Sequence, residues 1–160
     1  MAQKFRRRII REKVLQILFA HEMNQDSLKF SINELLSDIS NQADREFAND
    51  LIDRTLKHTN ELDEMIKGRV SNWEINRIAL IDRILIRMGI CELLYFPDIP
   101  PKVSINESIE IAKEYSTAGS AKFINGILDA ILSNEKKSGR INKQGRGLVE
   151  GPISKSSDDS

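Results

Sequence analysis

The stretch from Ile78 to Leu94 constrains the fold more than any other part of the chain, because twelve of its seventeen residues are apolar. A helix that is apolar on nearly all sides is buried on most of them. We therefore expect one helix, ending at residue 94 or 95, to run through the centre of the molecule with the other helices packed around it. The sequence from Ser71 to Glu74 is suited to capping its start.

Four charged residues interrupt this apolar stretch: Asp82, Arg83, Arg87 and Glu92. Burying an unpaired charge costs several kcal/mol, so each must reach an edge of the molecule or a partner. Ion pairs to neighbouring helices are one interpretation. A protein interface marked by Asp82 is the other, and the residues alone favour neither.

The rest of the chain repeats apolar residues at helical spacing and shows no convincing strand. Helical patterns cover residues 5–23, a short segment opened by Ser31, residues 41–66 as one long helix or a broken pair, a segment opened by Pro100 and Pro101, and a last segment after the turn at 117–120. Two pairs, Ser31 with Glu34 and Ser104 with Glu107, have capping-box spacing. These patterns predict an all-α bundle of six or seven helices.

The charges are distributed unevenly, although the whole chain has a formal net charge of zero. Residues 1–13 carry +5, residues 135–160 carry +2, and residues 14–134 carry −7. This asymmetry indicates a polyanion contact at the N-terminus and another kind of partner over the acidic body. The acidic residues from Asp44 to Glu64 are most simply a solvated face, with His58 as an exposed polar residue among them.

Four arginines gather at the start of the first helix: Arg6, Arg7, Arg8 and Arg11. Apolar residues follow on the same side two turns later, so we expect the first two turns to project past the packed body and to leave the guanidinium groups in water. Guanidinium groups bind phosphate bidentately and stack on bases, which favours an RNA contact. The alternative is a frayed start that only adds solubility.

Lys122 and Phe123 stand at the beginning of the last helix, where a charge and an aromatic ring suit a single-stranded base. A core position is the alternative for Phe123. Asn106 and the pair Asn125-Gly126 do not fit the amphipathic patterns. Glycine inside a helix costs about 1 kcal/mol relative to alanine, so a packing or binding reason is expected. The simplest reason is that Gly126 lets a neighbouring helix approach closely and Asn125 bonds a loop backbone.

Catalysis has little support in the sequence. His21 and His58 are far apart, His21-Glu22 lacks the second histidine of a zinc HExxH site, and no glycine-rich phosphate loop follows a strand. We therefore expect no catalytic residue, no metal and no cofactor. Cys91 is expected to be a core residue, and a single cysteine fits a reducing compartment. No segment is apolar enough to span a membrane, and the N-terminus lacks a secretory pattern.

Several strings together resemble the NusB family of bacterial transcription antitermination factors. They are DIPPKV at 98–103, VSINESIEIAKEYS at 103–116, KFINGILDAI at 122–131 and IDRILIRMGICELL at 81–94. The resemblance covers about residues 5–134. It implies two three-helix halves and an RNA-binding protein that pairs with NusE, a small-subunit ribosomal protein, on the boxA element of ribosomal RNA leader transcripts.

The resemblance also implies site residues. The RNA-contacting positions fall on Arg6, Arg7, Arg8, Arg11, Lys122 and Phe123, and the positions that face NusE fall on Asp82 and Arg83. Gly119 stands where some members have an acid, and Ile9 and Ile10 interrupt a longer arginine run. The RNA affinity is therefore expected to differ from that of other members.

We expect residues 1–134 to form one NusB-like domain and residues 135–160, which are rich in Ser, Gly, Lys and Asp, to form a disordered tail. The expected function is that of a cytoplasmic, non-enzymatic antitermination factor. It would bind single-stranded boxA-like RNA with NusE and join the RNA polymerase elongation complex with other Nus factors. The alternatives are an accessory NusB-like module of an rRNA methyltransferase system and a helical protein-interaction module without RNA.

Overall fold

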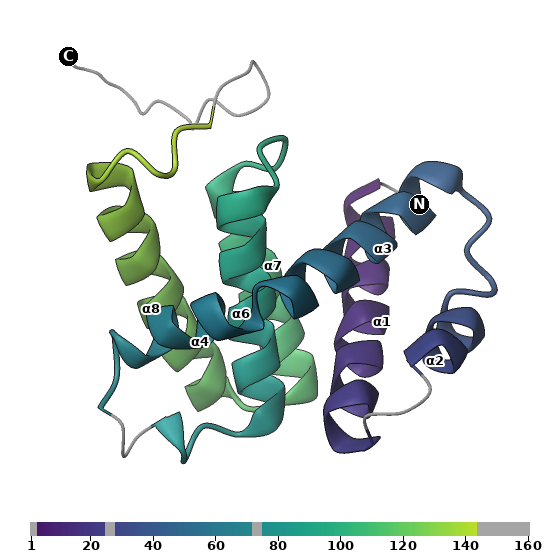
Figure 1. The fold of residues 1–160 in the computed structure, drawn as a ribbon, viewed down its shortest axis with the longest axis horizontal. Helices are drawn as coiled ribbons and strands as arrows, with labels where there is room; N and C mark the ends of the chain where they lie inside the picture. The colour runs from purple at the N-terminus through teal and green to yellow at the C-terminus, as the bar shows by residue number, and fades with distance from the viewer. Residues whose placement is uncertain (1–2, 25–27, 72–74, 144–160) are drawn as a thin grey trace.

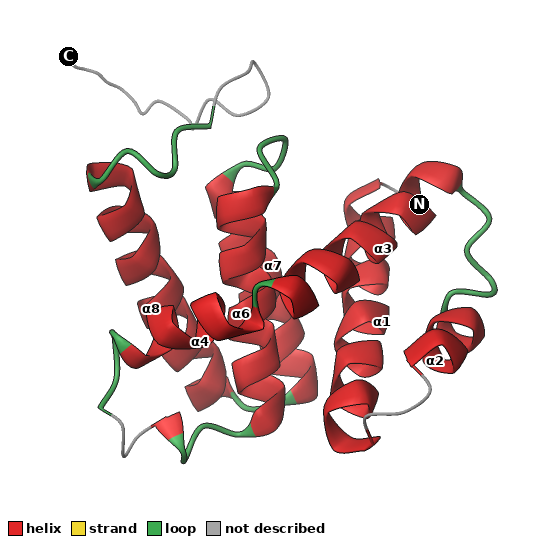
Figure 2. Cartoon of the chain, viewed as in Figure 1, coloured by secondary structure: helices red, strands yellow, loops and turns green. Residues whose placement is uncertain are grey.

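The structure, a computed structural model, describes residues 3–24, 28–71 and 75–143, apart from the side chains of residues 3 and 4. These residues form seven helices and no strand (Figure 2). The helices are α1 (Gln3–Asn24), α2 (Leu28–Leu35), α3 (Gln42–Lys57), α4 (Thr59–Lys67), α6 (Leu80–Tyr95), α7 (Pro101–Tyr115) and α8 (Ala118–Lys137). The prediction of an all-α bundle is confirmed, and none of the described helices is long and apolar enough to cross a membrane.

α6 lies at the centre and contacts α1, α3, α4, α7 and α8 (Figure 1). Eleven of its sixteen residues are buried, as its apolar composition predicts. At Gly89 a Cβ atom would lie 2.9 Å from Leu128 Cδ1 and 3.1 Å from Ser108 Oγ, so this glycine permits the close approach of α7 and α8. Nothing lies within 4 Å of a Cβ at Gly126, and the expectation of a close helix approach there is wrong.

Six of the seven helices form two groups of three, as the family resemblance implies, and α4 contacts α3 and α6. α1, α2 and α3 lie on the right of Figure 1, and α6, α7 and α8 lie to their left. Residues 42–67 form the broken pair α3 and α4, because His58 leaves the helical conformation with φ −105° and ψ 15°. His58 is not exposed as expected: its ring stacks on Tyr95 with centroids 4.0 Å apart.

The charged residues of α6 bond within the molecule. Arg87 donates to both oxygens of Asp63 at 2.7 and 3.0 Å, and Glu92 accepts from Arg11 at 2.7 and 2.9 Å. The ion-pair interpretation is confirmed for Arg87 and Glu92, because a buried charge without a partner would be too costly. Within the part of the chain that the structure describes, Arg83 makes only a long hydrogen bond, 3.5 Å, to the carbonyl of Ile78.

Both predicted capping boxes are wrong. Ser31 lies inside α2, which begins at Leu28, and the side chains of Ser104 and Glu107 bind partners outside their own helix. Pro100 caps α7, as predicted. The predicted turn at 117–120 is the first turn of α8, because the Thr117 hydroxyl accepts from the Ser120 amide at 2.9 Å.

The ordered chain extends beyond the predicted boundary at residue 134. α8 continues to Lys137, and Ile141 is buried. Arg140 pairs with Glu61 of α4, and the Lys143 ammonium donates to the carbonyls of Glu92 and Ile99. The expectation that a disordered tail begins at residue 135 is therefore wrong, because these side chains contact the folded body. Residues 144–160 of the expected tail lie outside the described part.

Candidate nucleic-acid interface

The basic start of α1 packs against α3 and α7. Arg6 Nε lies 3.0 Å from Asp44 Oδ2, and Arg7 Nε lies 3.5 Å from Asp44 Oδ1. Arg8 donates to both oxygens of Glu107 on α7, each at 2.9 Å. The expectation of a projecting helix end is therefore wrong, because carboxylates from two neighbouring helices hold these turns against the body. Asp44 is buried beneath the arginines and does not belong to the solvated acidic face.

Arg11 is buried, with only 4% of its surface exposed. Its guanidinium donates to both oxygens of Glu92, which also accepts from the Ser104 hydroxyl at 2.7 Å. Burial lowers the pKa of Arg11, but the charge and hydrogen bonds of Glu92 outweigh it and raise the pKa above its ordinary value. The predicted direct RNA contact of Arg11 is corrected, because its N–H groups are inside the fold.

Three of the four arginine side chains at this end stay partly exposed although each is paired. Four guanidinium groups meet three buried carboxylates, those of Asp44, Glu92 and Glu107. The side chains of Arg6, Arg7 and Arg8 keep 41%, 25% and 23% of their surface exposed. A guanidinium group has five N–H donors, so these pairs leave donors for a further acceptor.

Aromatic rings support and extend the arginine cluster. The Arg7 guanidinium lies 4.2 Å above the ring of Phe47, a cation–π contact from the inside. On the outside, Phe5 is 53% exposed, with the Arg8 guanidinium 6.0 Å from its ring centroid. Phe5 is therefore a further candidate for stacking on a base, and no motif in the sequence singles it out, although it lies on the turn that carries Arg8.

The beginning of α8 forms a second candidate corner. Lys122 is exposed and Phe123 is 36% exposed, so Phe123 is not a core residue. A cavity of about 440 Å³ is lined by Phe123 together with Ser120, Gly119, Asp82 and Arg77. Asp82 is 6% exposed; one of its oxygens accepts from the Ser120 hydroxyl at 2.6 Å, and the other has no partner among the described residues.

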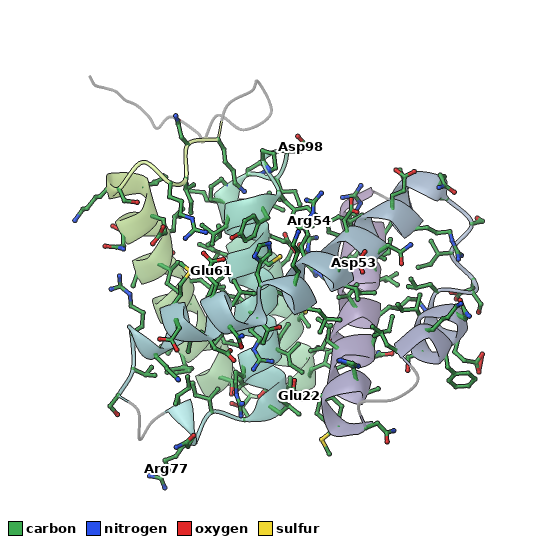
Figure 3. The ribbon with its side chains drawn as sticks, viewed as in Figure 1. Glu22, Asp53, Arg54, Glu61, Arg77 and Asp98 are labelled. Carbon is green, nitrogen blue, oxygen red and sulfur yellow. The ribbon has the colours of Figure 1, made fainter. Side chains whose placement is uncertain are left out.

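The two corners lie at opposite ends of the molecule. Figure 1 shows α1 starting at the upper end and α8 starting at the lower end. Arg77 is labelled at the lower end in Figure 3, and it lines the cavity that contains Phe123. The structure therefore brings Asp82 to Phe123 and separates both from the α1 arginines.

The described residues offer little for catalysis. They contain no group of three or more His, Cys, Asp and Glu that could hold a metal ion. Burial raises the pKa of Cys91 to about 12, which keeps this core thiol protonated and inert. The fold and these surfaces define an all-helical protein that exposes cationic side chains at the start of α1 and an aromatic ring at the start of α8.

The comparisons with known proteins identify the family: the NusB family pattern matches residues 8–133, and this chain belongs to the NusB family. The transcription antitermination protein NusB of Salinibacter ruber is 46% identical over 145 residues, which cover 89% of this chain and 91% of that protein. The structure of T. maritima NusB has a TM-score of 0.76 and 36% identity, over 84% of this chain and 95% of that one. A crystal structure of antitermination factors NusB and NusE in complex with dsRNA shares the fold, with a TM-score of 0.73 and 24% identity over 84% and 99% of the two chains.

Proposed function

We propose that this chain is a non-enzymatic transcription antitermination factor. It binds single-stranded boxA-type RNA of ribosomal RNA leader transcripts together with the ribosomal protein NusE, and it joins the elongating RNA polymerase with other Nus factors. Membership of the NusB family supports this proposal, since the Salinibacter ruber relative is described as a transcription antitermination protein. The cytoplasm is the compartment that this role requires.

The observation that carries the RNA contact is the excess of guanidinium groups at the start of α1. Hydrogen bonds to buried carboxylates orient Arg6 and Arg8, and the Phe47 ring supports Arg7, so less side-chain entropy is lost when the remaining N–H groups bind phosphate. Arg11 acts from inside, because its pair with Glu92 holds this part of α1 on α6.

The corner at the start of α8 provides the second contact. We place a single-stranded base on the exposed ring of Phe123, with a phosphate near Lys122. We place NusE on the surface around Arg83, in the first turn of α6, next to this corner. Asp82 is almost completely buried, so it acts on this surface by positioning Ser120.

The proposal is tested by titrating boxA RNA, with and without NusE, against the wild-type chain and the Arg6→Gln variant. Asp44 keeps Arg7 as a partner in this variant, so the fold should be retained. We expect weaker binding, and a slope of log K against log salt that is lower by about 0.7 if one phosphate contact is lost.

Arg69→Gln is the matched control, because Arg69 is an exposed arginine outside both corners. It removes the same charge and should leave the slope nearly unchanged. Equal RNA affinity and equal slope for the Arg6→Gln variant and the wild type would contradict the proposed contact.

A further inference from the structure

A groove between α7 and α8 has no role in the function described so far. Its volume is about 620 Å³, within the range of about 300 to 1,000 Å³ that is usual for small-ligand sites. Aliphatic side chains of both helices line it together with six polar residues: Lys102, Asn106, Glu107, Asn125, Asp129 and Lys136. Both asparagines that break the amphipathic patterns of the sequence thus face the same groove.

The two asparagines are free to bind a ligand. Neither side-chain amide forms a hydrogen bond with any residue that the structure describes, so the expected bond from Asn125 to a loop backbone is absent among them. Each amide offers two donors and an acceptor. This combination matches the edges of nucleobases, which present donors and acceptors side by side.

The charges of the groove favour an anionic ligand. Lys102 and Lys136 form no ion pair with the described residues. The carboxylate of Glu107 also lines the groove, but Arg8 neutralises it with two hydrogen bonds. Asp129 is therefore the one carboxylate among the lining residues that opposes the two ammonium groups.

The groove and the arginine cluster of α1 share one residue. This residue is Glu107, which accepts hydrogen bonds from Arg8 and also lines the groove. Arg8 and the α7–α8 groove therefore both contact Glu107, which places the groove next to the arginine cluster.

We infer that the α7–α8 groove is a second contact for the same single-stranded RNA. Asn106 and Asn125 bond base edges there, the aliphatic walls enclose the bases, and Lys102 and Lys136 hold the flanking phosphates. This inference rests on the proposed function, and it adds the place where bases, rather than phosphates, are read.

The first test is the double variant Asn106→Ala and Asn125→Ala, titrated with the same boxA RNA. Loss of base-edge hydrogen bonds should weaken binding roughly 5- to 150-fold without changing the salt slope. The control is the double variant Asn33→Ala and Asn49→Ala, which removes two exposed amides from α2 and α3. In the wild type, the side-chain NH₂ resonances of Asn106 and Asn125 should shift on addition of RNA.

The second test uses charge. Lys102→Gln with Lys136→Gln should lower the salt slope by about 0.7 for each lost phosphate contact, whereas Lys29→Gln with Lys57→Gln should change it little. Asp129→Asn should strengthen binding about two- to fivefold, because it removes a repulsive charge. A gain in affinity cannot result from unfolding, so this variant tests the site even if another variant folds poorly.

The outcomes separate the inference from the proposed function. If the asparagine and Asp129 variants bind RNA as the wild type does while Arg6→Gln weakens binding, the groove is not an RNA site and the proposed function stands. If the asparagine variants lose only the association with NusE, the groove is a protein site and the inference is overturned. If neither Arg6→Gln nor the groove variants affect RNA binding, the arginine contact fails as well, and the proposed function itself fails if the wild-type chain does not bind boxA RNA.

Discussion

Arg11 donates two of its five N–H groups to Glu92, which is 2% exposed and also accepts from Ser104. Arg11→Ala should leave this carboxylate buried without its counter-charge, and we expect the free energy of unfolding to fall by about 3 to 5 kcal/mol. Urea denaturation measures this loss. The control is Arg6→Gln, which removes the partly exposed pair with Asp44 and should lower the free energy of unfolding by at most about 1 kcal/mol. An equally small loss for Arg11→Ala would contradict the structural role.

Replacing Gly126 or Gly89 by alanine should change the free energy of unfolding in opposite directions. Gly126→Ala should raise the free energy of unfolding by about 0.5 to 1 kcal/mol, because alanine favours the helix and nothing lies within 4 Å of the added methyl group. Gly89→Ala should lower it by about 1 to 3 kcal/mol, because the methyl group would overlap Leu128 and Ser108. Thermal and urea unfolding of both variants measure the difference, and a shared sign would contradict the packing described at α6.

At the scale of elements, α1 and α7 lie side by side and run in the same direction. Arg8 bonds Glu107, and Gln16 bonds Tyr115 at 3.0 Å. The second pair lies eight residues after the first on both helices, so the helices are parallel. Glu12 lies between these two contacts and faces acidic residues of α7. Burial, and then the charge of Glu114, raise the pKa of Glu12 above its ordinary value.

The raised pKa of Glu12 gives a pH dependence with a definite sign. The folded chain binds this proton more tightly than the unfolded chain, so ionised Glu12 destabilises the fold above its folded pKa, and this penalty disappears as the pH falls through that value. Glu12→Gln should therefore have a higher Tm than the wild type at pH 7, and the difference should shrink on acidification. Calorimetry across that range measures it, and a Tm difference that grew in acid would contradict the assignment.

At the scale of the whole molecule, the start of α1, which carries the arginines, and the start of α8, which carries Phe123, lie at opposite ends (Figure 1). This separation predicts two independent components of RNA affinity. The arginine end should contribute the salt-dependent component, because phosphate contacts release counterions. The Phe123 ring should contribute a component that depends little on salt, because base stacking releases no counterions, and the salt dependence of this end should come from the phosphate near Lys122 alone.

Phe123→Ala should weaken RNA binding by about 1 to 3 kcal/mol if a base stacks on the ring, with an unchanged salt slope. The fold should tolerate the change, because the ring is 36% exposed. Phe30→Ala is the control, since Phe30 is an exposed phenylalanine on α2. A large fall in Tm without an RNA defect would instead place Phe123 among the core residues.

Much of the fold was predictable because helical periodicity is local. The central position of α6 follows from its composition, and its buried Arg87 and Glu92 had to have partners because an unpaired buried charge is costly. The capping boxes failed for Ser104 and Glu107 because spacing shows which bonds are geometrically allowed but not which competing partner is stronger. Each of these two side chains bonds a residue of another helix instead.

The amino-acid sequence by itself determined the helices, their apolar faces and the basic charge of the N-terminal turns, since these depend on residues within a few positions of one another. Only the tertiary structure decided which arginines stay available. Asp44 lies 38 residues from Arg6, and Glu107 lies 99 residues from Arg8, so no local pattern reveals these pairs. Packing turned four similar arginines into one buried structural residue, Arg11, and three partly exposed ones, because carboxylates of three different helices converge on the start of α1.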